Sequence, residues 1–110
     1  MSVPLEFFRG KNKPHYLLSE IQSEVARRSA AAFTRTALKN GLAMGLTVVQ
    51  LIDVVRGLSR GDFYKSMTTH SDHTVWQDVY HAQTPVGKVA YIKITGIDDG
   101  SPPVIQFKEQ

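Results

Sequence analysis

Hydrophobic residues in the first half of the chain recur with the period of an α-helix. Leu17, Ile21 and Val25 lie four residues apart with polar residues between them, which predicts an amphipathic helix ending near residues 27–28. Pro14 suits the first turn of this helix, because the backbone N–H that proline lacks has no helical partner there. The apolar stripe is expected to face the core.

A second helix is predicted after Thr34, a residue type that caps helix N-termini with its hydroxyl. Leu38 and Leu42 continue the helical period, and Gly45 suits the left-handed position that ends many helices. Gly41, inside this segment, costs about 1 kcal/mol relative to alanine. The segment therefore forms either one helix or two shorter pieces.

Thr47 and Gln50 have the spacing of a capping box, in which each side chain bonds the other residue's backbone N–H. A third helix is predicted to begin there, and Gly57 is expected to end it. Its buried stripe consists of Leu51, Ile52 and Val55.

From residue 62 onward, β-branched and aromatic residues come in runs with the two-residue alternation of strands. Turn-forming residues separate these runs at 70–73 and at 98–103. The pattern predicts a meander of antiparallel strands near 62–69, 74–82, 88–96 and 103–108.

The alternation also predicts which residues share a face of this sheet. One side of the last two strands is apolar and carries Ala90, Ile92, Ile94, Ile105 and Phe107. The helices are expected to cover that side, so that residues 1–110 form a single α+β domain with the helices packed on one sheet face. The opposite face is the candidate working surface, with Tyr91, Lys93, Gln106 and Lys108.

The composition, with 42% hydrophobic and 21% charged residues, is that of a folded domain rather than a disordered chain. The absence of cysteine excludes disulfides, thiolate nucleophiles and cysteine-bound zinc. No apolar run approaches the roughly 18 residues of a membrane-spanning helix, and residues 1–10 lack the pattern of a signal peptide. We therefore expect a cytoplasmic protein without membrane contacts.

The net charge of +3 is compatible with a polyanionic ligand but is not specific for one. Residues 1–61 contain nine Lys and Arg against four acidic residues, a net +5, whereas residues 62–110 contain four against six, a net −2. An RNA site in the second half therefore needs either its few lysines on one face or phosphate attraction from the first half.

Residues 70–73, His-Ser-Asp-His, place two histidines and an aspartate in a predicted turn. Neighbouring residues at a turn rarely converge on one ion, so neither a metal nor another cofactor is predicted. His73 suits general acid-base work because histidine changes charge near neutral pH, although a role in stabilising the turn needs no such chemistry.

The second half of the chain also carries a family resemblance. The run DFYKSMTT at 62–69, SDHT at 71–74, WQDVY at 76–80, YIKIT at 91–95 and FKE at 107–109 together resemble the MqsR toxin family. The match covers about half of the chain well, and the helical first half agrees in layout. A run of this length and composition is an improbable product of chance.

The resemblance implies a RelE-like α+β fold, with residues 1–12 as a loosely ordered extension. It implies the toxin of a type II toxin-antitoxin pair, an endoribonuclease that cuts free mRNA at GCU-type sites and so blocks translation. The implied partners are mRNA and an MqsA-like antitoxin, through which alone the toxin would contact operator DNA. His70 and His81 stand where a tyrosine and an arginine are familiar in the family, which bears on local RNA affinity and site preference.

The family residues tied to activity fall here on Lys65, Gln77, Tyr91 and Lys108. RNA can be cleaved without a metal when its own 2′-hydroxyl attacks the adjacent phosphate, which needs a base, an acid and positive charge at the phosphate. Lys65 and Lys108 would supply that charge. Tyr91 would transfer a proton or orient the substrate, and Gln77 would hold the nucleotide by a hydrogen bond. Further candidates for substrate binding are Lys93 and His73.

Two other functions are open to this sequence. A catalytically silent RelE-like module would bind the antitoxin and alter its DNA binding, because a fold does not by itself imply activity. The retention of all four family residues argues against this alternative. A nonspecific RNA binder would instead use the basic helices, through Arg27, Arg28 and Arg35.

Overall fold

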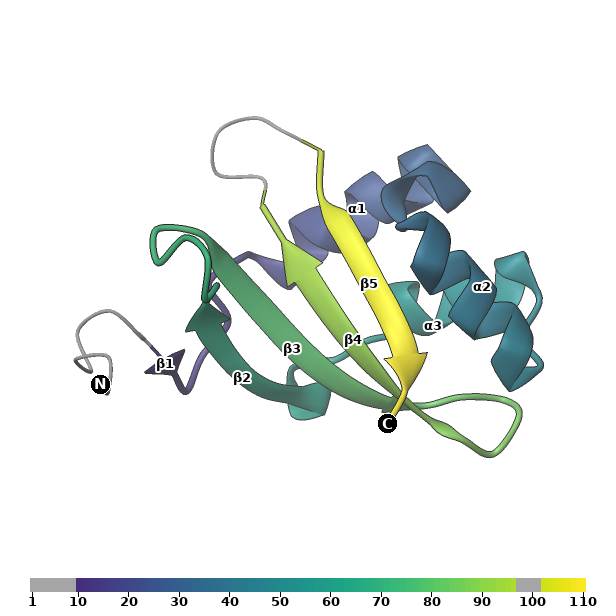
Figure 1. Ribbon diagram of the computed structural model, residues 1–110. Helices are drawn as coiled ribbons and strands as arrows, with labels where there is room; N and C mark the ends of the chain where they lie inside the picture. Colours follow the sequence, from purple (N-terminus) through teal and green to yellow (C-terminus); the bar gives the residue numbers. More distant parts are fainter. Residues whose placement is uncertain (1–9, 97–101) are drawn as a thin grey trace.

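The computed structural model describes residues 10–96 and 102–110, in which α-helices cover one face of an antiparallel sheet (Figure 1). The strands are β1 (Gly10–Lys11), β2 (Phe63–Thr68), β3 (Trp76–Gln83), β4 (Val89–Thr95) and β5 (Val104–Glu109). The helices are α1 (Leu18–Arg28), α2 (Arg35–Met44) and α3 (Val48–Arg56), with short 3-10 turns at Ser29–Ala32 and Arg60–Asp62. The predicted α+β class is confirmed, and its likeness to RelE stays a prediction.

The strands follow one another in chain order across the sheet, each antiparallel to its neighbour. The predicted meander is therefore confirmed, with every strand of the second half ending within two residues of its expected position. The sequence pattern did not predict β1, which pairs with β2 although it falls in the stretch expected to be an extension. Residues 1–9 of that stretch and the predicted turn residues 98–101 lie outside the described residues.

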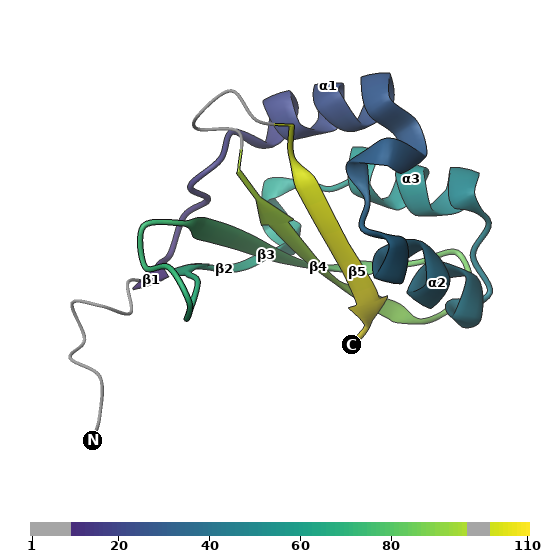
Figure 2. The ribbon, with the colours of Figure 1, turned by 45° about the horizontal axis from the view of Figure 1, so that its top comes forward.

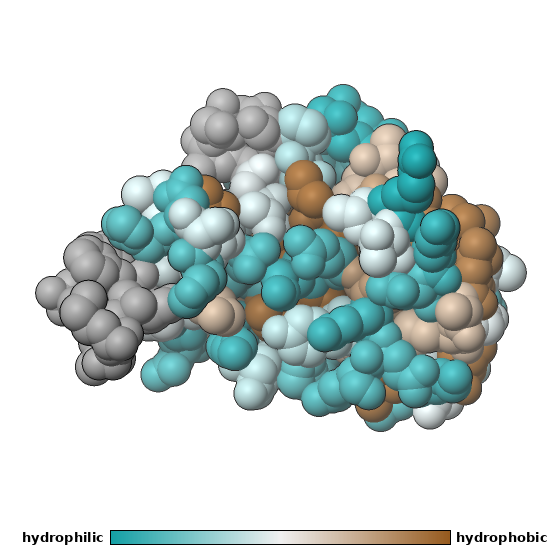
Figure 3. Space-filling view, viewed as in Figure 1, coloured by the Kyte–Doolittle hydropathy of each residue, from teal (hydrophilic) through white to brown (hydrophobic). Residues whose placement is uncertain are grey.

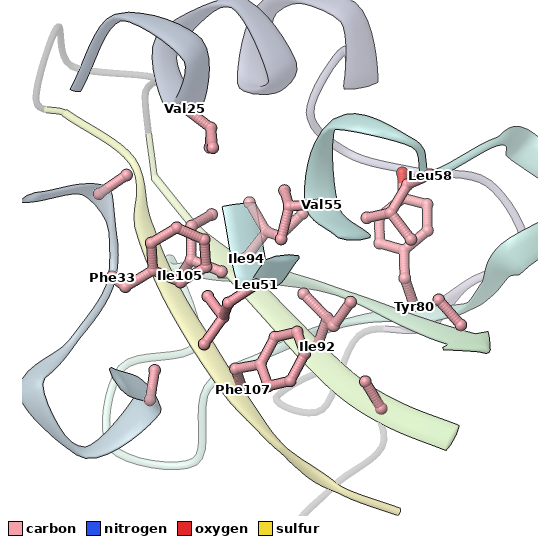
Figure 4. Close-up of a cluster of buried hydrophobic side chains, with 14 of the residues drawn as sticks. Val25, Phe33, Leu51, Val55, Leu58, Tyr80, Ile92, Ile94, Ile105 and Phe107 are labelled. Carbon is pink, nitrogen blue, oxygen red and sulfur yellow. The ribbon is translucent and has the colours of Figure 1, made fainter. Parts of the chain in front are cut away.

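The sheet and the helices form two layers (Figure 2), and the hydrophobic core lies between them (Figure 4). Its most deeply buried residues, each at most 1% exposed, include Ile21, Val25, Leu51, Val55, Tyr80, Ile92, Ile94, Ile105 and Phe107. The predicted apolar face of β4 and β5 is thus the inner face. Each buried aliphatic side chain contributes roughly 1.5–3 kcal/mol by leaving water, so the core determines which face of the sheet remains open.

Helix α1 begins later than its hydrophobic pattern predicted. Leu17 is 62% exposed and has extended backbone angles, and Pro14 precedes the helix instead of lying in its first turn. The sheet holds this segment by other bonds: Asp78 on β3 accepts from the backbone N–H of His15 at 2.9 Å and of Tyr16 at 2.8 Å. These long-range bonds keep the chain extended, so only Ile21 and Val25 of the predicted stripe are buried.

Helices α2 and α3 begin and end where their capping residues predicted. Thr34 accepts from the backbone of Ala37, Gly45 ends α2 in the left-handed conformation, and the capping box of α3 is present. Gly41 does not divide α2, which is one continuous helix. No single helix in the described ranges is long and apolar enough to cross a membrane, although α2 and α3, bent by 103°, pass that test as a pair.

Candidate active site

The open face of the sheet, opposite the helices, carries mainly polar side chains (Figure 3). The strand register arranges them in rows. One row runs His81, Tyr91, Lys108 across β3, β4 and β5, and the next runs Lys65, Val79, Lys93, Gln106 across β2 to β5. We call this surface the open face. All four residues that the family resemblance singled out lie on it.

A β-bulge between Phe63 and Lys65 adds Tyr64 to the first row. The extra residue allows two consecutive side chains to reach one face: Lys65 lies opposite Val79, and the Tyr64 ring stacks on His81 with 4.3 Å between centroids. The bulge therefore concentrates an aromatic ring and a cation at the edge of the site.

Three lysines surround the two tyrosines of the open face. Lys65 Nζ lies 5.4 Å from the Tyr64 ring, and the Nζ atoms of Lys108 and Lys93 lie 5.1 and 5.9 Å from the Tyr91 ring. Within residues 10–96 and 102–110, none of these three lysines forms an ion pair with a carboxylate. Three of the four second-half lysines thus cluster on one face, which the sequence alone left open, while Lys88 pairs with Glu109.

Val79 lies beneath these lysines. It is fully buried although it belongs to the open face rather than to the core between sheet and helices. Long lysine side chains bury their methylene stems on apolar surface while their ammonium groups stay in water. Val79 therefore gives the Lys65 and Lys93 stems, its partners on the neighbouring strands, an apolar base.

Tyr91 is half-buried, and this burial raises the pKa of its phenol above the ordinary value of 10, with a smaller contribution from Tyr64. The phenol is consequently neutral at physiological pH. A neutral phenol donates a hydrogen bond and can give up a proton to a leaving oxygen, but it is a poor base.

Gln77 and His73 lie toward the other end of the strands. The Gln77 amide donates to Thr95 Oγ1 at 3.1 Å, which orients its side chain on the open face. His73 lies in the exposed turn between β2 and β3, which Asp72 stabilises by accepting from the backbone and hydroxyl of Thr74. The structure therefore brings Gln77 close to the lysine row but does not bring His73 beside Tyr91.

A cavity of about 400 Å³ opens where α2 meets the open face. Helix α2 runs along the edge of β5, where the Thr34 backbone N–H donates to the Ile105 carbonyl and Asn40 Nδ2 donates to the Phe107 carbonyl. The cavity is lined by Thr34, Thr36, Ala37, Asn40, Tyr91, Lys93, Gln106, Phe107 and Lys108.

Known proteins share much of this sequence. Residues 13–109 match the family described as motility quorum-sensing regulator, toxin of MqsA. The chain belongs to this family. The mRNA interferase toxin MqsR of Escherichia coli (strain K12) is 44% identical over 100 residues, covering 91% of this chain and 98% of that protein. The predicted family is thereby confirmed, and with it the enzyme class, an endoribonuclease.

Two further rings of the open face, Tyr64 and His81, were not among the predicted site residues, although His81 was noted as a departure from the family pattern that bears on RNA affinity. The His81 ring lies between Tyr64 and Tyr91, 5.3 Å from the latter. Its Nδ1 lies 3.3 Å from the Gln110 amide nitrogen, and its buried Nε2 has no hydrogen-bond partner in the part of the chain that the structure describes. Strand alternation from Gln77 would have placed His81 on this face, whereas Tyr64 depends on a bulge that no sequence pattern announced.

The helices offer a weaker site for RNA. Glu24 accepts from Arg27 at 2.6 Å and from Arg28 at 2.9 Å, and these hydrogen bonds lower the pKa of its carboxyl group. The single Glu24 carboxylate offsets one of the two arginine charges, which weakens the attraction of this part of α1 for RNA without removing it. Among the described residues, no group of three or more His, Asp or Glu side chains is placed to hold a metal ion.

Proposed function

We propose that this chain is the toxin of a toxin-antitoxin pair that cuts cytoplasmic mRNA at GCU-type sites by using the RNA's own 2′-hydroxyl, without a metal. The observation that carries this proposal is a cluster of three lysines on the open face, Lys65 beside Tyr64 and Lys93 and Lys108 beside Tyr91, none of which pairs with a carboxylate of the described residues. Unpaired ammonium groups attract and hold phosphates. Family membership and the mRNA interferase from Escherichia coli support mRNA as the substrate.

In the proposed reaction, the 2′-oxygen attacks the adjacent phosphorus while the bond to the 5′-oxygen breaks. The products are a 2′,3′-cyclic phosphate and a 5′-hydroxyl end. Lys65 and Lys108 stabilise the negative charge that builds up on the phosphate oxygens. The neutral Tyr91 phenol donates a proton to the departing 5′-oxygen, the 2′-hydroxyl proton passes to solvent, and the Tyr91 phenolate then regains a proton from solvent.

Gln77, Lys93 and His73 act on the RNA rather than on the reacting bonds. Gln77, which lies in the row next to that of Lys65, holds a nucleotide by a hydrogen bond. Lys93 adds positive charge next to Tyr91. His73 contacts the RNA where it leaves the sheet over the β2–β3 turn. An MqsA-like antitoxin silences the toxin, in line with the family's description, and any contact with operator DNA goes through that antitoxin.

The test is incubation of the purified protein, with EDTA present, with a synthetic RNA that contains one GCU site. The wild type should release a 2′,3′-cyclic phosphate, and Lys65→Ala should cleave about 100-fold more slowly, the usual cost of losing one charge-stabilising group. Tyr91→Phe should also be slow, while Arg56→Ala, on the exposed surface of α3, should behave like the wild type.

Wild-type rates in Lys65→Ala and Tyr91→Phe would show that the assigned residues are wrong. Cleavage that EDTA abolishes would show that a metal is required. Intact RNA in every reaction would favour the catalytically silent antitoxin-binding module.

A further inference from the structure

We infer that the cavity between α2 and β5 holds one base of the RNA, next to the phosphate bound by the lysines, and that Asn40, Gln106 and Thr36 read that base. The inference rests on the proposed function and adds to it a site of base recognition. A volume of about 400 Å³ falls within the range of roughly 300–1,000 Å³ typical of small-ligand sites.

The cavity has two chemically different walls. Lys93, Lys108 and Tyr91 form the wall on the open face, where the phosphate is expected. Neutral hydrogen-bonding side chains, Thr36 and Asn40, line the α2 wall. A nucleotide has the same division between a charged phosphate and a neutral base with donors and acceptors, and sequence-specific RNA recognition usually splays such bases out of single strands.

Asn40 presents a fixed acceptor to this cavity. Its Nδ2 donates to the Phe107 carbonyl at 2.9 Å, which settles the orientation of the amide and leaves its oxygen without a partner among the described residues. An acceptor in this place selects a base edge that offers an N–H donor. Asn40 therefore favours a base with an exocyclic amino group or a ring N–H directed toward α2.

Gln106 is the adaptable partner. It lies directly opposite Lys93 in the strand register, so a base beside it is close to a phosphate held by that lysine. Its side chain is exposed and forms no hydrogen bond with the described residues, and Thr36 is exposed as well. Both side chains can bond a base without giving up a hydrogen bond to any residue that the structure describes.

Binding can be tested without cleavage by titrating the four nucleoside 3′-monophosphates into the ¹⁵N-labelled protein. One base should bind more tightly than the others and shift the side-chain amide signals of Asn40 and Gln106. The Gln22 amide, which bonds carbonyls on the helical side, serves as the internal control and should not move. Identical shifts with inorganic phosphate, or with all four bases alike, would overturn the inference.

Specificity can be tested by cleavage of an RNA library that carries every base on each side of the cut. Gln106→Leu and Thr36→Val should each reduce the base preference at one position about tenfold. Without the polar side chain, the preferred base loses a hydrogen bond that the other bases cannot form, so the bases differ less in binding free energy. Val104→Thr, at an exposed position of β5 outside the cavity, is the matched control and should keep the wild-type preference.

The base-recognition inference and the proposed function are contradicted by different results. If wild type and variants cleave with the same base preference, the cavity does not read a base, while the proposed function stands. If the wild type cleaves no RNA, the proposed function fails, and the nucleotide titration alone then decides whether the cavity binds a base.

Discussion

Two tyrosines on adjacent strands show how position within the sheet sets the chemistry of a phenol. Tyr80 points into the core, is 1% exposed, and has its pKa raised to about 12, chiefly by burial and secondarily by Asp78. Tyr91 points to the open face and is half-buried, and its pKa is raised for the same principal reason. Of these two tyrosines, only Tyr91 lies beside lysines of the open face, which is why the proposal assigns the proton transfer to Tyr91 rather than to Tyr80.

The buried Tyr80 predicts a loss of stability in alkali. Above pH 10 the unfolded chain releases the phenolic proton while the folded chain retains it until about pH 12, so folding becomes less favourable as pH rises through this window. At pH 11 the loss in the free energy of unfolding is roughly 1.4 kcal/mol, because this pH lies about one unit above the pKa of the phenol in the unfolded chain and below its pKa in the folded chain. Urea unfolding at pH 8 and pH 11 should show this loss in the wild type and a smaller one in Tyr80→Phe.

Tyr64→Phe is the control for this measurement, because it removes a phenol that is 56% exposed. Equal losses in the wild type and Tyr80→Phe would mean that Tyr80 does not titrate differently in the folded and unfolded chains.

At the scale of elements, the packing of α2 on α3 depends on Gly41. A Cβ built at this position would lie 2.1 Å from Cδ1 of Leu51, a core residue of α3 that is 1% exposed. The missing side chain allows the two helices to approach closely. By helix propensity alone, Gly41 destabilises α2. The close contact with Leu51 of α3 explains why a larger residue does not fit at this position.

Gly41→Ala is therefore predicted to destabilise the protein. Alanine adds about 1 kcal/mol of helix propensity, but forcing a methyl group into a packed interface typically costs 1–3 kcal/mol. We expect a net loss of about 1 kcal/mol in the free energy of unfolding, measured by denaturant titration. A stabilised variant would mean that Leu51 moves aside freely.

Two companion variants identify the cause of that loss. Gly61→Ala, where a Cβ would lie 3.6 Å from its nearest neighbour, should change stability little. Adding Leu51→Val to Gly41→Ala should cost less than the two single changes together, because the smaller side chain makes room for the methyl group.

At the scale of the whole molecule, the sheet separates two functions. Its inner face carries the core under the helices, and its open face carries the lysines. The excess of basic residues in the first half misleads here, because the site lies in the half whose net charge is −2. A local cluster of lysines that do not pair with carboxylates of the described residues can attract phosphates even where the net charge of the segment is negative.

The affinity for RNA should fall with salt concentration to an extent set by the three lysines of the open face. Each phosphate contact with a single strand contributes about −0.7 to the slope of log K against log salt concentration, so three lysines predict a slope of about −2. Fluorescence anisotropy with a 2′-O-methyl RNA, which cannot be cleaved through its 2′-oxygen, measures the slope. Lys93→Gln should reduce its magnitude by about 0.7.

The control is Arg56→Gln, which removes a charge from the exposed surface of α3 and should leave the slope unchanged. If the slope changed in Arg56→Gln and not in Lys93→Gln, the RNA would bind the helical side of the molecule instead of the open face.

The sequence by itself determined the features that depend on near neighbours in the chain. Thr34 and Thr47 marked helix starts because a cap bonds backbone groups three residues away, and alternation assigned Tyr91 and Lys108 to one face because successive strand residues point to opposite sides. The family resemblance added Lys65 and Gln77 as candidates. Their roles in the reaction stay a prediction.

Only the tertiary structure decided the features that depend on contacts between distant segments. The hydrogen bonds that Asp78 accepts from residues 15 and 16 hold the chain extended, so α1 begins later than the pattern predicted. The bulge at Tyr64 places the ring of that residue against His81. The cavity arises because α2 is fastened along the edge of β5, more than sixty residues away in the chain. Local patterns carry no information about such pairings, because register and packing are set by the whole core at once.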